Sequence, residues 1–290
     1  MTNTGALSVI TDEISQDIKS VLPSLKQYGI THVELRNVWN KNIIDFSDEE
    51  LEKLKQLLDG QDMRVCNVAG PLFKCYAPWT SKHDPRSLSY GRNVQRSRDM
   101  RERVLEICKT LECDRTRVFG YLWPVNFVKF MFSFNYPEIT ADQWQQLVDD
   151  IVAFVDMAKS ENITVVMENE AMALVSTWES TLRILEDIQD PSFQLLLDPG
   201  NYFFCNEIHP PSTYLEIQDR VGHQHIKDGK KTLGVKHFTT VGEGLLGYDE
   251  YFDAWTGSGY NGYFSLETHV LFRKSNISYK SLANMQEMLE

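Results

Sequence analysis

Short apolar runs alternate with longer amphipathic stretches along the whole chain. Eight runs have the length and the β-branched or aromatic character of strands, and they cover residues 7–11, 32–36, 64–69, 117–122, 163–169, 193–198, 221–227 and 262–267. Amphipathic segments such as 17–29, 47–60 and 90–112 lie between them. Strands that alternate with helices in this way predict parallel β-α-β units.

The segment 47–60 carries signals for both ends of a helix. Ser47 is followed three residues later by Glu50, which is the pattern of a capping box, and Gly60 is a helix stop. A helix is therefore expected between them.

Eight such units favour a closed (β/α)8 barrel of the α/β class, formed by residues 1–290 as one domain. A doubly wound sheet is the main alternative for alternating strands and helices. The chain has no GxGxxG and no GxxxxGK[ST] motif, so nucleotide binding by those routes is unsupported.

Composition narrows the class of protein. Hydrophobic residues make up 42% and charged residues 24%, as in a globular protein with a full core, and the net charge of −12 argues against binding a nucleic-acid backbone. The five cysteines include no CxxC pair and indicate thiols in a reducing compartment. Without an apolar span or a secretory signal in the sequence, we expect a cytoplasmic protein with no membrane partner.

Four potential metal ligands end four successive predicted strands. They are Glu168, Asp198, His225 and Glu267. Three carboxylates and one imidazole form a hard, oxygen-rich set that suits a divalent cation. The chemistry of a (β/α)8 barrel lies at the C-terminal ends of its strands, so the four residues are expected to meet there.

Side-chain alternation supports this meeting point. His223, His225 and Lys227 share one face of their strand, and Glu168 and Glu267 lie on equivalent polar faces. A lone buried glutamate is more often part of a structural ion pair, but several carboxylates in one place require a compensating cation. Four ligand-type residues at equivalent positions therefore favour a metal site.

The sequence resembles the xylose isomerase-like sugar phosphate isomerases and epimerases over nearly its whole length. The resemblance rests on VITDEIS, HVELRNVW, RVFGYLW, ENE, LDPGN, HIKDG, the GEG of 242–244 and GYFSLETH. It implies that Glu168, Asp198, His225 and Glu267 hold one divalent metal ion, which is manganese, cobalt, magnesium or zinc. The phosphate in the family name is not carried over to this chain.

The chemistry implied by this resemblance is removal of a proton next to a carbonyl group of a sugar, sugar acid or polyol. The metal holds the carbonyl and a neighbouring hydroxyl oxygen and stabilises the enediolate that forms. By resemblance, Glu168 and Glu267 are both metal ligands and the catalytic acid/base pair.

Several other residues are candidates for binding the substrate. Asn201 stands where many family members have a histidine that contacts the substrate, so the chain departs from the family there. Lys227 suits an anionic or hydroxyl-rich substrate, or else pairs with Asp228 or Glu243. His223 is expected to support a ligand or the core rather than to bind metal.

Basic residues near the early strands have two interpretations. Arg36, Lys74 and Arg117 could hold a phosphate or carboxylate group, or could neutralise barrel carboxylates such as Glu13 or Glu34. Glu170 is either a substrate contact or a helix-capping acid.

Two long segments, 70–90 and 122–139, follow the third and fourth predicted strands and are rich in aromatic residues and proline. Loops at this end of a barrel shape the substrate pocket. Trp39, Trp79 and Trp123 could stack on a sugar, and packing at the rim is the alternative.

The leading hypothesis is a metal-dependent isomerase or epimerase with a small carbohydrate substrate. A lyase that dehydrates a keto-polyol such as an inosose is the alternative, because the same enediolate can expel a β-hydroxyl. An apurinic-site endonuclease fits less well, since it needs further histidine ligands and a basic surface. A non-catalytic sugar-binding barrel has no need of two glutamates at a metal. The resemblance also makes a homo-oligomer possible, although no feature of the sequence sets its size.

Overall fold

The eight apolar runs form one curved sheet of parallel strands. The computed structural model describes residues 5–80, 93–124, 132–270 and 272–290. In chain order the strands are β1 (Ala6–Val9), β2 (His32–Leu35), β5 (Arg64–Leu72), β6 (Arg115–Phe119), β7 (Thr164–Glu168), β8 (Phe193–Leu197), β9 (Val221–Ile226) and β12 (Tyr263–Leu266). They pair in the order β1-β12-β9-β8-β7-β6-β5-β2.

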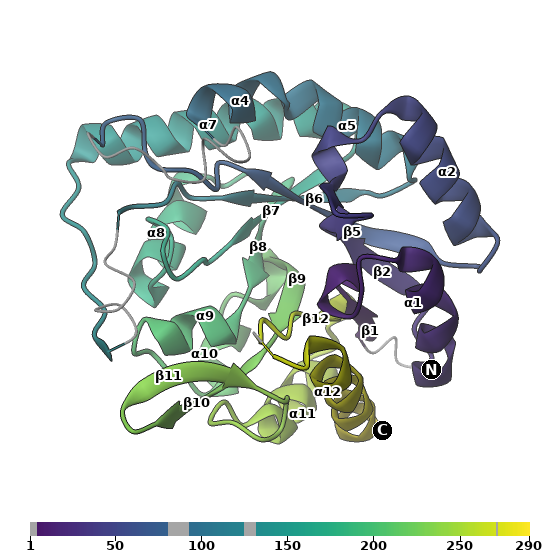
Figure 1. The fold of residues 1–290 in the computed structure, drawn as a ribbon. Helices are drawn as coiled ribbons and strands as arrows, with labels where there is room; N and C mark the ends of the chain where they lie inside the picture. Colours follow the sequence, from purple (N-terminus) through teal and green to yellow (C-terminus); the bar gives the residue numbers. More distant parts are fainter. Residues whose placement is uncertain (1–4, 81–92, 125–131, 271) are drawn as a thin grey trace.

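The sheet curls so that β1 and β2 meet at a seam. An isolated parallel bridge between Ile10 and Glu34 joins the ends of these two strands. Figure 1 shows the strands around a common axis with the helices outside them. The predicted (β/α)8 barrel is confirmed as a nearly closed barrel.

Amphipathic helices surround the sheet because each has one apolar face to bury. They are α1 (Ile18–Leu25), α2 (Asp48–Asp59), α4 (Val94–Asp99), α5 (Arg101–Thr110), α7 (Ala141–Ser160), α8 (Trp178–Asp187), α9 (Pro199–Phe204), α10 (Pro211–Leu215), α11 (Tyr248–Gly257) and α12 (Lys274–Leu289). Single 3-10 turns cover Thr11–Glu13, Lys26–Tyr28, Ile43–Asp45 and Gln218–Arg220. None of the helices in the described ranges is long and apolar enough to cross a membrane.

The amphipathic stretch 90–112 has a continuous apolar pattern, which suggests one helix, but the structure breaks it into two. Its described part forms two helices, α4 and α5, and Met100 is both the C-cap of the first and the N-cap of the second. The apolar face continues across the break, which is why the pattern does not reveal it. Residues 90–92 lie outside the described residues.

Two small hairpins were not predicted. β3 (Asn37–Val38) pairs with β4 (Lys41–Asn42), and β10 (Asp228–Thr232) pairs with β11 (Val235–Thr239), both antiparallel. The second hairpin turns through Leu233 and Gly234, which both have positive φ, as a tight hairpin turn requires. It leaves the barrel directly after β9, beside the C-terminal ends of the strands.

Strand β9 shows how alternation separates the barrel interior from the helical layer. The side chain of Gln224 accepts a 2.5 Å hydrogen bond from Tyr251 Oη of α11, whereas His225 faces the barrel axis. Both residues are fully buried. The side chains of β9 that carry chemistry therefore project into the barrel, as their spacing predicts.

The predicted helix signal at Ser47 gives a direct test of local stability. Ser47 Oγ accepts from Glu50 N, and the Glu50 carboxylate accepts from Ser47 N, so the capping box is present. Ser47→Ala removes one of these bonds and is expected to lower the free energy of unfolding by about 1 kcal/mol in urea denaturation. Gln61→Ala, just past the same helix, should change the free energy of unfolding by no more than about 0.5 kcal/mol. Equal effects of the two changes would contradict the capping role.

Candidate metal centre and substrate pocket

The four predicted ligands meet at the C-terminal ends of four strands. Glu168 is the last residue of β7, Asp198 follows β8, His225 lies near the end of β9, and Glu267 follows β12. Ligand atoms from all four lie within 4.8 Å of one another, and all four side chains are buried. The barrel thus brings together residues that are up to 99 positions apart, from Glu168 to Glu267.

His225 tests whether this group suits a metal ion. Its Nδ1 is buried without a hydrogen bond and lies 3.8 Å from Glu168, 3.8 Å from Asp198 and 3.5 Å from Glu267, measured to the nearest carboxylate oxygens. A buried nitrogen facing three carboxylates is the donor arrangement that a divalent cation needs. The residues present therefore fit a metal ion.

Lys227 reaches into the same group from β9's C-terminal end. Its Nζ lies 2.6 Å from Asp198, 2.6 Å from Glu267 and 4.0 Å from Glu168. Its side chain is only 2% exposed. The ammonium group therefore lies among the carboxylates that are expected to bind the metal.

The two alternative partners of Lys227 are engaged elsewhere. Asp228 accepts hydrogen bonds from the backbone N–H groups of Gly229, Gly242, Gly244 and Leu246. Glu243 pairs with Lys280 at the surface. The alternative interpretation, in which Lys227 pairs with Asp228 or Glu243, is therefore wrong, because Lys227 pairs with Asp198 and Glu267 instead.

Arginines hold the outer oxygens of the two glutamates. Arg117 Nη1 lies 2.8 Å from Glu168, and both side chains are almost fully buried. Arg36 Nη1 lies 2.7 Å from Glu267 and its guanidinium also pairs with Asp12 and Glu13. These bonds fix each carboxylate and leave its other oxygen directed at the centre.

The charges set the protonation of the glutamates. Burial alone would raise their pKa values, but the Arg117 guanidinium holds the pKa of Glu168 below its ordinary value. For Glu267, Lys227 and then His269 outweigh burial and hold the pKa well below the ordinary range. Both glutamates are therefore kept ionised.

Asp198 shows that negative charge is in excess at the centre. Burial raises its pKa to about 6 despite the attraction of Lys227, and Glu168 and Glu267 contribute to the rise. The same carboxylate field raises the pKa of Lys227 above its ordinary value, although burial alone would lower it. A further cation would relieve this excess.

The DPGN sequence forms the turn that presents Asp198. Asp198 is the N-cap of α9 and accepts a 3.0 Å bond from Asn201 N, and Pro199 occupies the first helical position. A Cβ on Gly200 would lie 2.7 Å from the carbonyl oxygen of Lys227, so only glycine fits. The motif therefore packs Asp198 and Lys227 against each other.

Asn201 donates hydrogen bonds to two of the expected metal ligands. Its Nδ2 donates to Glu168 at 3.0 Å and to Asp198 at 3.2 Å, and the residue is buried. Neighbouring Asn169 exchanges two hydrogen bonds with the Asp198 backbone. Sequence reasoning did not single out Asn169, although its place in the ENE motif beside Glu168 was a usable signal. Substrate binding by Asn201 stays a prediction.

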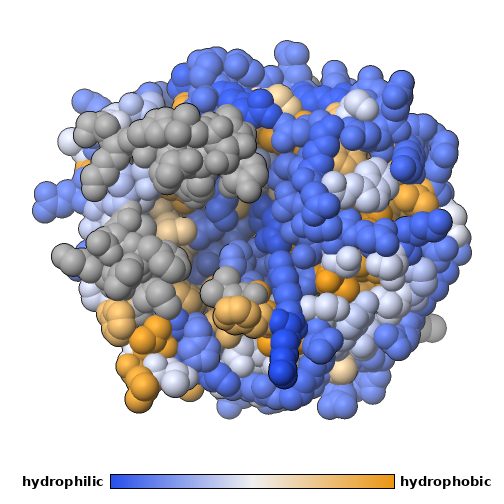
Figure 2. All heavy atoms as spheres, in the orientation of Figure 1, coloured by the Kyte–Doolittle hydropathy of each residue, from blue (hydrophilic) through white to orange (hydrophobic). Residues whose placement is uncertain are grey.

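A pocket of about 370 Å³ opens next to this centre, and its charged lining consists of Glu13, Arg36, Lys74, Arg117, His269 and Lys274. Figure 2 shows a hollow near the middle of the molecule whose visible walls are mainly hydrophilic. Of the predicted substrate-binding residues, Arg36 and Lys74 line this pocket directly.

Glu170 belongs to the same region through its ion pair with Lys74. It does not cap a helix, because Thr177 is the N-cap of α8. Roles of Lys74 and Glu170 toward a substrate remain predictions.

The tryptophans pack at the rim. Trp39 stacks on Phe46, Trp79 contacts the edge of Tyr121 and Trp123 the edge of Phe134. Parts of the two long segments near them, residues 81–92 and 125–131, lie outside the described residues.

Glu34 is the residue that sequence reasoning most undervalued. It lies at the barrel seam, is fully buried, and accepts hydrogen bonds from both His223 and His225. His223 is thus a partner of Glu34 rather than one of the four predicted ligands. The available signal was a charged residue in the apolar run HVELR, which a buried strand tolerates only with partners.

A protein-family model matches most of the chain. The family model described as xylose isomerase-like TIM barrel matches residues 22–285. Two curated relatives are inosose dehydratases. The enzyme of Geobacillus thermodenitrificans (strain NG80-2) is 25% identical over 146 residues, which cover 45% of this chain and 49% of the relative. The enzyme of Bacillus cereus (strain AH820) is 27% identical over 149 residues, which cover 46% of this chain and 49% of the relative. The chain spans about half the length of these relatives.

Solved structures share the fold at low identity. The IOLI protein with a bound zinc atom has a TM-score of 0.73, 14% identity and coverage of 98% of both chains. For L-ribulose 3-epimerase the TM-score is 0.73 and the identity 15%, with coverage of 98% of this chain and 94% of the other. For a Mycobacterium smegmatis xylose isomerase-like TIM barrel protein in complex with magnesium, the TM-score is 0.71 and the identity 11%, with coverage of 99% of this chain and 98% of the other. At this identity the likeness establishes the fold alone.

The geometry predicts about one equivalent of divalent metal per purified chain. Asp198→Asn keeps a residue able to cap α9 but removes one anionic ligand. Metal affinity, measured by calorimetry, should fall by more than the roughly 10- to 100-fold that loss of an outer partner costs. Glu170→Gln alters a nearby buried carboxylate outside the ligand set and should leave affinity unchanged. Metal binding that survives Asp198→Asn unaltered would contradict this site.

Proposed function

Because the chain belongs to the xylose isomerase-like TIM barrel family, we propose that it is a metal-dependent enzyme that removes a proton from the carbon beside a carbonyl group of a polyol. The observation that carries this proposal is the buried group of Glu168, Asp198, His225 and Glu267, which would hold the metal. When bound there, a divalent cation supplies Lewis-acid polarisation of the carbonyl group.

The residues of the chain perform the proton transfer. Glu267 is the proposed base, because it is ionised, buried and at the edge of the 370 Å³ pocket through its partner Arg36. Asp198 and His225 are proposed as ligands only. Exclusion of water by the buried surroundings strengthens each of these charge interactions.

The position of Lys227 favours dehydration as the outcome. Its ammonium group lies 2.6 Å from Glu267, so a base and an acid stand side by side. Glu267 takes the α-proton, Lys227 gives a proton to the β-hydroxyl, that hydroxyl leaves as water, and a carbon–carbon double bond forms. The names of the curated relatives support this outcome, since they are inosose dehydratases.

Isomerisation or epimerisation is the second candidate. Glu168 and Glu267 come from β7 and β12, which are separated in the sheet by β8 and β9, so two carboxylates approach the centre from different strands. One could remove the proton and the other return it. The arginine ion pairs do not separate the two candidates, because Arg36 lies 2.7 Å from Glu267 much as Arg117 lies 2.8 Å from Glu168. What favours dehydration is the acid beside Glu267, the ammonium group of Lys227.

The charge pattern of the pocket favours an uncharged, hydroxyl-rich substrate. In the part of the chain that the structure describes, each lysine and arginine of the lining is paired with a carboxylate. Arg36 pairs with three, Arg117 with Glu168, Lys74 with Glu170 and Lys274 with Glu13. A phosphate group would need an uncommitted cation. A keto-polyol such as an inosose instead needs the many donors and acceptors present here.

Solvent-deuterium incorporation tests the shared first step. Incubation of the metal-loaded protein with a panel of inososes and keto-sugars in deuterated water should place deuterium beside the carbonyl of at least one compound. Glu267→Gln should slow this exchange by roughly 10²- to 10⁴-fold, because a general base contributes about that much. Exchange at the wild-type rate in this variant, with metal bound, would contradict the assignment of the base.

Lys227→Met separates dehydration from epimerisation. If Lys227 protonates the leaving hydroxyl, the variant should keep deuterium exchange but lose release of water, seen by mass spectrometry as a substrate that no longer loses one water. Lys236→Met is the matched control. Lys236 is also buried, but its Nζ donates to the carbonyl of Phe204 outside the ligand group. A wild-type product of unchanged mass would instead favour the isomerase or epimerase.

A further inference from the structure

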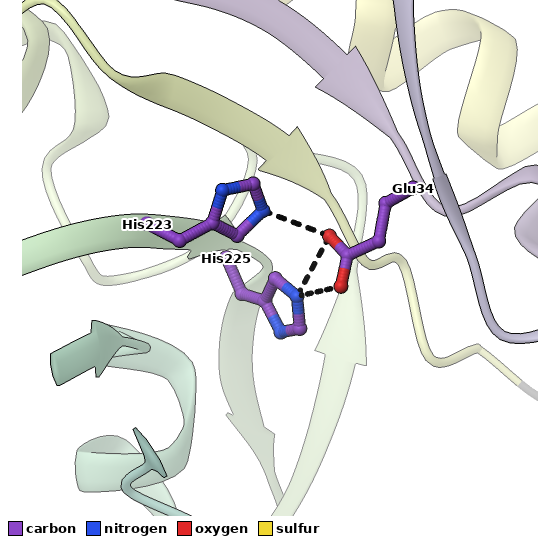
Figure 3. Close-up of side chains that lie close together, drawn as sticks. All are labelled: Glu34, His223 and His225. Carbon is purple, nitrogen blue, oxygen red and sulfur yellow. Dashed lines mark hydrogen bonds and ion pairs between the residues drawn. The ribbon is translucent and has the colours of Figure 1, made fainter. Parts of the chain in front are cut away.

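Glu34 links two histidines across the interior of the barrel. It lies on β2, whereas His223 and His225 lie on β9. Across the seam between β1 and β2, the strands β1 and β12 lie between them. As Figure 3 shows, both rings point at the same carboxylate. His223 Nε2 lies 2.9 Å from Glu34 Oε2, and His225 Nε2 lies 3.0 Å from each of its oxygens.

A third donor completes the surroundings of Glu34. Asn67 Nδ2 on β5 donates to Glu34 Oε1 at 2.9 Å. An ionised carboxylate only accepts hydrogen bonds, so each histidine bonded to it carries its proton on Nε2. In the neutral imidazole that would bind a metal, the opposite nitrogen of His225, Nδ1, then has the free electron pair, and this is the atom that faces Glu168, Asp198 and Glu267.

From this geometry we propose that Glu34 is a positioning residue that makes His225 bind the metal through Nδ1. It fixes the tautomer and the ring orientation of His225 without touching the metal or substrate. The inference rests on the proposed metal centre and adds which atom binds and what selects it. Carboxylates that hold the far nitrogen of a metal-binding histidine act in this way in metal sites generally.

The neighbouring strand brings one of the donors to Glu34. The pairing of β2 with β5 shifts register after Val33 so that Asn67 lies opposite Glu34, and the bridge to Ile10 places Glu34 at the seam of the barrel. The extra residue of this irregularity, Cys66, lies in β5. A fully buried carboxylate is costly unless several donors satisfy it, so the three donors account for its presence.

The test compares two variants of the same hydrogen-bonded trio. In Glu34→Gln only one acceptor oxygen remains for the N–H groups of Asn67, His223 and His225, so His225 no longer has an ionised carboxylate that fixes its tautomer. In His223→Gln the pair of Glu34 with His225 is kept. Both changes disturb the buried trio, but only the first disturbs the ring that would bind metal.

Affinity for Co²⁺ or Zn²⁺ is measured by competition with a chelator. The proposal expects roughly 10- to 100-fold weaker binding in Glu34→Gln and near wild-type binding in His223→Gln. Unchanged binding in Glu34→Gln, or equal loss in both variants, would overturn it.

A measurement on the wild-type protein keeps the inference testable if Glu34→Gln does not fold. In the zinc-loaded protein, nitrogen-15 NMR of the histidine rings should show His225 with metal on Nδ1 and a proton on Nε2. The cobalt-loaded protein should show a strongly shifted, slowly exchanging signal from that Nε2 proton. Metal bound through Nε2 would overturn the inference and leave the proposed function intact, whereas a wild-type protein that binds no metal would defeat the proposed function itself.

Discussion

The rest of the site depends on the convergence of three buried carboxylates at one end of the barrel. Glu168, Asp198 and Glu267 are brought within a few ångströms of one another by the strands that carry them. Such a group is unstable in a buried place unless cations compensate it. That requirement accounts for the arginines and Lys227 around the group and for the raised pKa of Asp198.

The cationic side chains that compensate the three carboxylates lie at different distances from the middle of the proposed metal site. Arg117 and Arg36 bind the outer oxygens and fix the glutamates. Lys227 pairs with the inner oxygens of Asp198 and Glu267, the position from which it is proposed to protonate a substrate hydroxyl. Below the ligands, Glu34 holds His225 from the opposite side of the barrel. Each carboxylate thus has a supporting partner, as a preorganised site needs.

Much of this arrangement could be predicted from the sequence. The eight strands and the capping box at Ser47 follow from periodicity and local spacing. The meeting of Glu168, Asp198, His225 and Glu267 follows from their equivalent positions at strand ends. The ion-pair partners could not be predicted, since they depend on which strands lie opposite in the closed barrel. Glu34 meets His223 of β9 across 189 positions of sequence because the barrel closes, and no local signal marks that contact. The break at Met100 and the hairpin β10–β11 likewise leave the apolar pattern unchanged.

Crystallographic analysis of the protein grown with Mn²⁺, using anomalous diffraction, tests the central claim most directly. The account predicts one strong anomalous peak among Glu168, Asp198, His225 and Glu267, with His225 Nδ1 within bonding distance of it. Lys227 Nζ should then lie off the metal position, toward the pocket. A peak at another place, or carboxylates bridged by Lys227 alone at saturating Mn²⁺, would contradict it.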